Sequence, residues 1–164
     1  MTSISNPSHP AGIETISAAE WSDTIDRNLS TVFFVTRAVV PAMLAAGYGR
    51  VINIASVSGP VAAYRGDIAY HAAKSGVVGL TRSVAIDLAD RGVTANAVAP
   101  GWIATGSATD DEVAQGQMTP IGRSGTPEEV ATAVTSLALR GSSYMTGQVI
   151  VVDGGNSIAE ERRG

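Results

Sequence analysis

The stretch Val51-Ile52-Asn53-Ile54-Ala55 follows the turn Gly47-Tyr48-Gly49 and leads into Ser56. A short, mostly apolar run after a turn is typical of a strand that is covered on both faces in a parallel sheet. Two similar runs, Val93 to Ala99 and Gln148 to Val152, come later in the chain, and helical patterns separate the three. Strands that alternate with helices predict an α/β fold with a parallel sheet and right-handed crossovers.

Three long helices are predicted from capping residues and apolar periodicity. One capping box, Ser17-Ala18-Ala19-Glu20, opens a helix to about Ala46, and another, Thr126-Pro127-Glu128-Glu129, opens a helix to about Leu139. Between them, Asp67 is the expected cap of a helix from about Ile68 to Asp90, which closes at Gly92.

The connection from Gly101 to Gly125 is long, and we expect a short helix near Asp110 to Gln117 within it. Its length suggests a mobile lid over a substrate or cofactor. We interpret three large side chains of the first helix as core, namely Trp21, Phe33 and Phe34.

The composition limits the classes of function. The 164 residues, 45% of them hydrophobic, fit one compact domain over 1–164, with residues 1–12 expected to be flexible. A net charge of −4 with scattered basic residues argues against a nucleic-acid partner. The absence of cysteine excludes disulfides and thiolate chemistry, and two isolated histidines, His9 and His71, predict no metal site. Since we find no secretory signal and no apolar run of about 18 residues, we expect a cytoplasmic protein without a membrane segment.

The run Ala69-Tyr70-His71-Ala72-Ala73-Lys74 places a phenol and an ammonium four residues apart at the start of a predicted helix. Both side chains project from one face, where the cation favours the phenolate and lowers the tyrosine pKa. The pair predicts a general acid/base, because an ordinary tyrosine with a pKa of about 10 is a poor one near neutrality. The alternative is an accidental pair on a solvated helix. No cation stands at this spacing after the other tyrosines, Tyr48, Tyr64 and Tyr144.

The chain resembles the short-chain dehydrogenase/reductase family from about Pro10 onward, in particular its 3-oxoacyl-acyl-carrier-protein reductase-like members. The resemblance rests on residues that occur in this order: Asn28, Asn53-Ile54-Ala55-Ser56, Tyr70 with Lys74, Asn96-Ala97-Val98-Ala99-Pro100-Gly101, Thr146-Gly147 and Val152-Asp153-Gly154-Gly155. It implies a partial Rossmann-like, three-layer fold with about three parallel strands flanked by helices.

The resemblance also implies four catalytic residues. Tyr70 exchanges a proton with the substrate oxygen, and Lys74 lowers the pKa of Tyr70 and holds the nicotinamide ribose. Ser56 donates a hydrogen bond to the substrate carbonyl, and Asn28 distorts its helix and holds a water of the proton relay. Two alternatives stay open from the residues alone: Ser56 as an ordinary strand-end serine, and Asn28 as a tolerated surface residue.

The implied cofactor is NAD or NADP, held by Tyr70 and Lys74 together with the segment after the second strand, namely Pro100, Gly101, Ile103 and Thr105. A plain turn at Pro100-Gly101 is the alternative. The implied partners are a small carbonyl or alcohol substrate and a second subunit, either a copy of this chain or a full-length relative, paired through the two long helices around Asn28 and Tyr70.

One part of the family pattern is not found in this sequence. Family members begin with a strand and a Gly-x-x-x-Gly-x-Gly turn that holds the cofactor pyrophosphate, and no such pattern occurs in the 164 residues. The chain therefore resembles the C-terminal half, and we expect Val51 to Ala55 to be an open sheet edge. Three functions remain: a nicotinamide-dependent oxidoreductase, a non-redox proton-transfer enzyme, and an interaction partner that has lost its cofactor.

Overall fold

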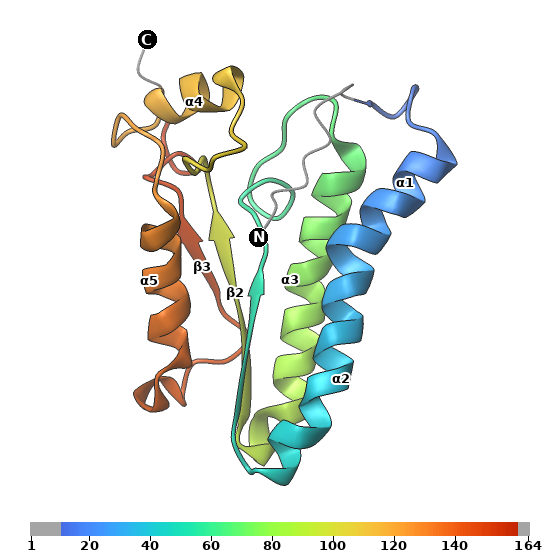
Figure 1. Cartoon of the computed structure of the whole chain (residues 1–164), viewed down its shortest axis with the longest axis vertical. Helices are drawn as coiled ribbons and strands as arrows, with labels where there is room; N and C mark the ends of the chain where they lie inside the picture. Colours follow the sequence, from blue (N-terminus) through green and yellow to red (C-terminus); the bar gives the residue numbers. More distant parts are fainter. Residues whose placement is uncertain (1–10, 161–164) are drawn as a thin grey trace.

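A computed structural model describes residues 11–160, which form a three-stranded parallel sheet with helices on both sides (Figure 1). The strands are β1 (Gly49–Ile54), β2 (Val93–Pro100) and β3 (Val149–Val152), in the order β1-β2-β3. Two long helical segments cover one face, and α5 (Pro127–Ala138) covers the other. The predicted partial Rossmann-like α/β fold is confirmed.

The first helical segment is continuous but changes its winding in the middle. It consists of α1 (Ala18–Ile25), a π-helical turn η1 (Asp26–Ser30) and α2 (Thr31–Ala45). The predicted capping box is present, because the Ser17 side chain accepts from the backbone N–H of Glu20 and the Glu20 carboxylate accepts from the backbone N–H of Ser17. Single π-turns inside helices are frequent at functional sites.

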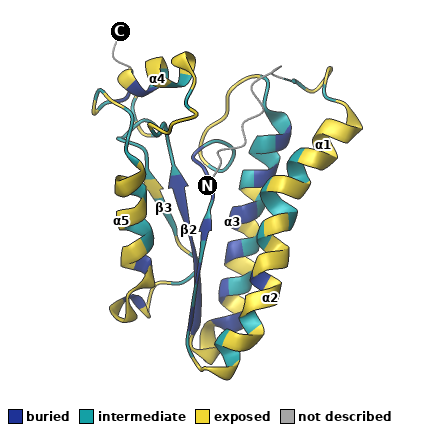
Figure 2. Ribbon diagram, in the orientation of Figure 1, coloured by how far each residue is buried: buried dark blue, intermediate teal, exposed yellow. Residues whose placement is uncertain are grey.

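The second segment, α3 (Ile68–Leu88), packs on the central strand and forms the core with it. Val77 and Val78 of α3 lie against Ala97 and Ala99 of β2. Every residue of β2 from 93 to 99 is buried, as the dark strand in Figure 2 shows. The helix continues into a 3-10 turn, η2 (Ala89–Arg91), and ends at Gly92 with φ of 76°, as predicted.

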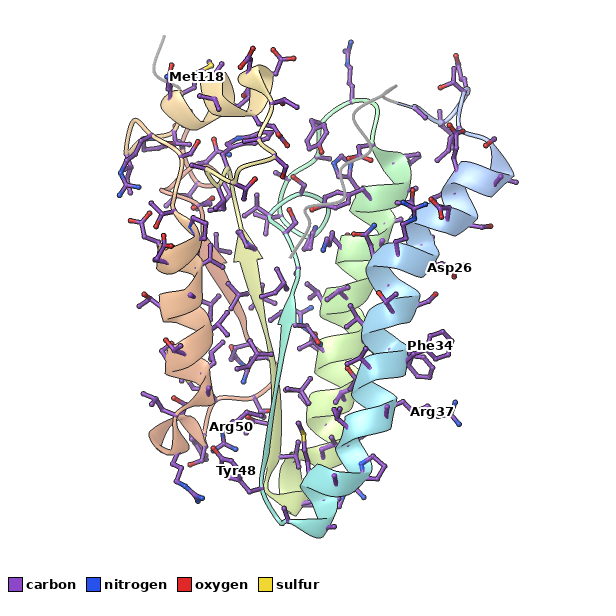
Figure 3. All side chains as sticks on the ribbon, viewed as in Figure 1. Asp26, Phe34, Arg37, Tyr48, Arg50 and Met118 are labelled. Carbon is purple, nitrogen blue, oxygen red and sulfur yellow. The ribbon has the colours of Figure 1, made fainter. Side chains whose placement is uncertain are left out.

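The remaining elements follow the sequence closely. The predicted short helix is confirmed as α4 (Asp110–Gln117), and α5 begins with the predicted capping box of Thr126 and Glu129. A 3-10 turn, η3 (Arg140–Ser142), follows α5. At this end of the sheet, the Tyr48 ring has the Arg50 and Arg140 guanidinium groups 4.5 and 4.6 Å from its centre, and Tyr48 and Arg50 lie side by side in Figure 3.

Strand β1 is an edge of the sheet within the described residues. Its odd-numbered residues pair with β2, as the bonds from the Gly49 N–H to the Gly92 carbonyl and from the Ala55 N–H to the Val98 carbonyl show. Because N–H and C=O groups alternate in direction along a strand, those of Arg50, Ile52 and Ile54 face the open side. The expected open edge is confirmed for residues 11–160.

Two expectations about individual residues are wrong. Trp21, Phe33 and Phe34 are not core, since they are 40%, 43% and 59% exposed. Phe34 points away from the molecule in Figure 3. The periodicity located the helix correctly, but these side chains lie on the face of α1–α2 that no described element covers. Asp67 makes no side-chain cap for α3, because its carboxylate accepts a hydrogen bond from the Tyr64 hydroxyl instead.

The sequence led us to expect no membrane segment, and one helix bears on that expectation. Within the described residues, one helix, Ala18–Ala45, is long and apolar enough to cross a membrane by length and composition alone. The sequence expectation counted an unbroken apolar run, whereas a helix of this composition includes isolated polar residues such as Thr36 and Arg37. A single helix of this kind is weak evidence for a membrane, since such helices also occur in the layers of α/β proteins.

Candidate active site

Three of the predicted site residues come together beyond the carboxyl end of β1. Ser56 follows the strand and is buried at 8% exposure, and its hydroxyl accepts from the Ser58 N–H at 3.1 Å. Tyr70 lies in the first turn of α3, near enough to Ser56 for that side chain to influence the pKa of its phenol. Lys74 follows one turn later, with its Nζ 5.4 Å from the centre of the Tyr70 ring. The carboxyl end of a parallel strand is where ligands of such sheets bind.

The environment of Tyr70 keeps its phenol protonated. Burial raises the pKa of Tyr70 above its ordinary value, and the hydrogen bond with Ser56 opposes that rise. The carboxylates of Asp67 and Glu112 raise the pKa further, because a phenolate beside them would be repelled. In this arrangement Tyr70 is therefore a neutral phenol near neutral pH.

The expected effect of Lys74 on this pKa is not found. The Lys74 ammonium donates to the backbone carbonyl of Ile54 at 3.2 Å, and burial lowers the pKa of Lys74. The Ile54 carbonyl is one of those on the open edge of β1, so no strand competes for it among the described residues. The prediction that Lys74 lowers the pKa of Tyr70 is wrong for the chain in this arrangement, because the cation is held by a carbonyl and the desolvation of the phenol dominates.

Asn28 lies inside the π-turn η1, so the predicted distortion of the helix at this residue is confirmed. Its side-chain amide donates to the Thr24 carbonyl at 3.0 Å. Leu29, in the same turn, packs against Gly76 of α3. A Cβ added at Gly76 would stand 2.7 Å from a Leu29 methyl carbon. This contact with α3 is therefore made by Leu29, and the role of Asn28 with a relay water stays a prediction.

Four residues at and after the end of β2 are expected to hold the cofactor, namely Pro100, Gly101, Ile103 and Thr105. They differ in whether their backbone groups are already hydrogen-bonded. The Pro100 carbonyl accepts from the Val57 N–H, and the Gly101 N–H donates to the Val152 carbonyl. A Cβ at Gly101 would stand 2.7 Å from the Cβ of Asp153. This close packing within the turn explains the glycine at this position without any bound ligand. The Thr105 side chain is exposed, and the N–H and C=O of Ile103 make no hydrogen bond within the described residues.

Sequence reasoning missed an aromatic cluster beside Tyr70. The His71 ring lies 6.4 Å from that of Tyr70 and 4.6 Å from that of Tyr64. The Tyr64 ring in turn lies 6.4 Å from that of Trp102. No periodic signal connects these residues, because they come from two loops and a helix.

Comparisons with known proteins agree with this architecture. The family profile described as enoyl-(acyl carrier protein) reductase matches residues 2–157. The 3-oxoacyl-[acyl-carrier-protein] reductase FabG of Vibrio cholerae is 44% identical over 140 residues, which are 83% of this chain and 57% of that protein. The cyclohexanol dehydrogenase of an Acinetobacter species is 43% identical over 142 residues, covering 86% of this chain and 56% of the other.

A solved structure, acetoin dehydrogenase YohF from Salmonella typhimurium, superimposes with a TM-score of 0.84 at 33% identity and covers 94% of this chain and 64% of its own. The chain belongs to the short-chain dehydrogenase/reductase family, in the group that resembles the 3-oxoacyl-acyl-carrier-protein reductases. It spans a little over half the length of these curated relatives, 57% of the Vibrio cholerae reductase and 56% of the Acinetobacter dehydrogenase.

Proposed function

We propose that this chain carries the proton-transfer residues of an NAD(P)-dependent oxidoreductase, which reduces a carbonyl or oxidises a secondary alcohol. The observation that supports it most is the grouping of Ser56, Tyr70 and Lys74 beyond the end of β1, with the Lys74 Nζ 5.4 Å from the centre of the Tyr70 ring. Family membership supports oxidoreduction in general.

In the reducing direction, each residue has a defined task. The Ser56 hydroxyl donates to the substrate carbonyl and stabilises the charge that develops on its oxygen. Tyr70, protonated near neutrality, gives its proton to that oxygen and becomes a phenolate. Lys74, once released from the Ile54 carbonyl, stabilises the phenolate. Asn28 takes part in the proton relay that reprotonates Tyr70. Oxidation of an alcohol runs through the same steps in reverse.

The residues present fit one end of a nicotinamide cofactor. The free N–H and C=O of Ile103 and the exposed Thr105 hydroxyl can bind an amide, and the Lys74 ammonium, beside Tyr70, can bind ribose hydroxyls. Bound there, the cofactor supplies or accepts the hydride. Pro100 and Gly101 shape the turn beside it. The sequence contains no Gly-x-x-x-Gly-x-Gly turn for the pyrophosphate, and the choice between NAD and NADP stays open.

Substrate and partners are proposals as well. The relatives are named for acyl-carrier-protein substrates and for cyclohexanol, so we propose a small carbonyl or alcohol substrate without choosing between them on that ground. For the second subunit we propose a copy of this chain or a longer relative. It would cover the apolar groove between α2 and α3, which is lined by Phe33, Val40, Leu80 and Val84 among others. A cytoplasmic location stays a prediction.

A second candidate follows from the same geometry. Ser56, Tyr70 and Lys74 all lie in this chain, and together they can enolise a ketone without any nucleotide. Exchange of the α-hydrogens of a ketone with D₂O, catalysed by the chain alone, would support this reading. An interaction partner without activity is the third candidate, and Tyr70→Phe would then leave its function unchanged.

Titration of the purified chain with NADH and with NADPH by calorimetry tests the proposal. We expect saturable binding of one of them, weakened about tenfold in Lys74→Met because an ionic hydrogen bond to the ribose is lost. No binding of either nucleotide to a sample with a cooperative unfolding transition would contradict autonomous oxidoreductase function.

A further inference from the structure

Three aromatic side chains from three separate segments form a cluster that reaches Tyr70 through His71, whose ring lies 6.4 Å from that of Tyr70. Tyr64 belongs to the β1–α3 connection, His71 to α3, and Trp102 to the segment after β2. The Tyr64 and His71 rings meet edge to face with centres 4.6 Å apart, and the Tyr64 and Trp102 rings are tilted by 34° at 6.4 Å. We call these three residues the aromatic cluster.

The cluster is held in place although part of it faces solvent. Tyr64 is 47% exposed, yet its hydroxyl donates to the Asp67 carboxylate at 2.9 Å. The backbone at Trp102 is fixed by its carbonyl, which accepts from the Gly125 N–H at 2.9 Å. A fixed aromatic surface binds a flat apolar ligand without first losing conformational freedom.

Near the cluster, carboxylates outnumber the single ammonium, that of Lys74. Asp67 and Glu112 both raise the pKa of Tyr64 and of Tyr70, so both carboxylates lie close to the two phenols. Neither carboxylate forms an ion pair within the described residues, since Asp67 binds Tyr64 and Glu112 caps α4 at Thr109. Arg65, the arginine nearest in sequence, has an exposed side chain. An anionic ligand at this place would be repelled.

We infer that the aromatic cluster receives the ring of a neutral cyclic ketone or secondary alcohol and directs its oxygen toward Tyr70, so that Tyr64 and Trp102 determine the substrate class. This inference rests on the proposed function, which assigns Tyr70 to the substrate oxygen. Aromatic side chains pack well against flat rings and poorly against a flexible chain that must be ordered. The pair of carboxylates selects against an anionic group on the ring.

Nuclear magnetic resonance can test this on the full chain, because it contains only two tryptophans, Trp21 and Trp102. Their two indole N–H signals are assigned with Trp21→Phe. The probes are cyclohexanone, its open-chain counterpart 2-hexanone, and the anion 4-oxocyclohexanecarboxylate. We expect cyclohexanone to shift the Trp102 signal and to bind about fivefold or more tightly than either of the others.

Substitutions at Tyr64 test whether its ring contributes to cyclohexanone binding. Tyr64→Leu should weaken cyclohexanone binding about fivefold, whereas Tyr64→Phe, which keeps the ring, should stay within about twofold. Tyr144→Leu is the matched control, since Tyr144 is fully exposed and lies outside the cluster. No shift of the Trp102 signal, equal binding of 2-hexanone or of the carboxylate, or an unchanged affinity in Tyr64→Leu would overturn the inference. The titration contains no nicotinamide, so a failure of the proposed redox function leaves its outcome unaffected.

Discussion

The Lys74 ammonium binds the carbonyl oxygen of Ile54 at 3.2 Å, on the open edge of β1, and its nitrogen lies 5.4 Å from the centre of the Tyr70 ring. The cation is therefore near the phenol without holding its oxygen. Tyr70 lies half-buried beside Ser56, in a setting that favours the neutral phenol. The chain has the parts of an acid/base site in an arrangement that favours the acid form.

This arrangement predicts the pH dependence of the proposed reaction. Because burial raises the pKa of Tyr70 above 10, the proton donor stays present throughout the neutral range and is lost only as pH rises past the raised value. The rate of carbonyl reduction at saturating substrate should therefore be flat from about pH 6 to 9. Initial rates in overlapping buffers measure this, and a steep fall between about pH 6 and 8 would show that another group is the acid.

Two glycines of α3 provide a matched pair for the contact between η1 and α3. A Cβ at Gly76 would stand 2.7 Å from a Leu29 methyl carbon, whereas a Cβ at Gly79 meets nothing within 4 Å. Gly76→Ala should lower the free energy of unfolding by about 1–3 kcal/mol through overpacking. Gly79→Ala should raise it by up to about 1 kcal/mol, because alanine is the better helix former. Urea unfolding measures both, and equal effects would mean that η1 does not pack on α3 as described.

A buried polar chain links β1 to α3. The Asn53 amide donates to the Thr81 hydroxyl at 2.8 Å, which donates to the Val77 carbonyl at 2.7 Å. Thr81→Val keeps the shape but leaves the Asn53 N–H unpaired, so unfolding should require about 1–3 kcal/mol less free energy. Ser83→Ala, at an exposed position of the same helix, is the control. A loss below about 0.5 kcal/mol in Thr81→Val would indicate that water replaces the hydroxyl.

The start of α5 should respond to acid. Two hydrogen bonds of 2.8 Å join Arg123 to Glu129, and this contact lowers the pKa of Glu129 to about 2. A carboxylate whose pKa is depressed by folding stabilises the fold above its ordinary pKa, and this stability is lost as pH falls toward the depressed value. Wild type should melt above Glu129→Gln at pH 7, and the difference should shrink between about pH 4.5 and 2. A difference in Tm that does not change with pH would exclude the ion pair as its cause.

Much of the fold could be predicted because its signals are local. The capping boxes at Ser17 and Thr126 place two helix starts, and the short apolar runs place the strands. Parallel topology then brings Ser56 and Tyr70 to one end of the sheet. Predicting these features requires only short stretches of sequence and the rule that parallel strands are joined by right-handed crossovers.

The features that could not be predicted from the sequence depend on which surfaces are covered by other parts of the protein. Periodicity marks Phe33 and Phe34 as one apolar face of a helix, but it does not say what packs on that face, and in this structure nothing described does. Similarly, the bond from Lys74 to Ile54 exists because β1 is an edge. The contact of Tyr64 with Trp102 joins two loops distant in sequence, and no pattern within either loop predicts it.

The central claim is that Tyr70 transfers the proton in a nicotinamide-dependent reaction. Its most direct test is the rate of NADH or NADPH oxidation at 340 nm by the purified chain with a ketone, compared between wild type and Tyr70→Phe. Tyr144→Phe, at a fully exposed position, serves as the control. The account predicts turnover by the wild type and a loss of about 10²–10⁴-fold in Tyr70→Phe alone. Equal rates in wild type and Tyr70→Phe, or no turnover by a folded wild-type chain that binds nucleotide, would contradict it.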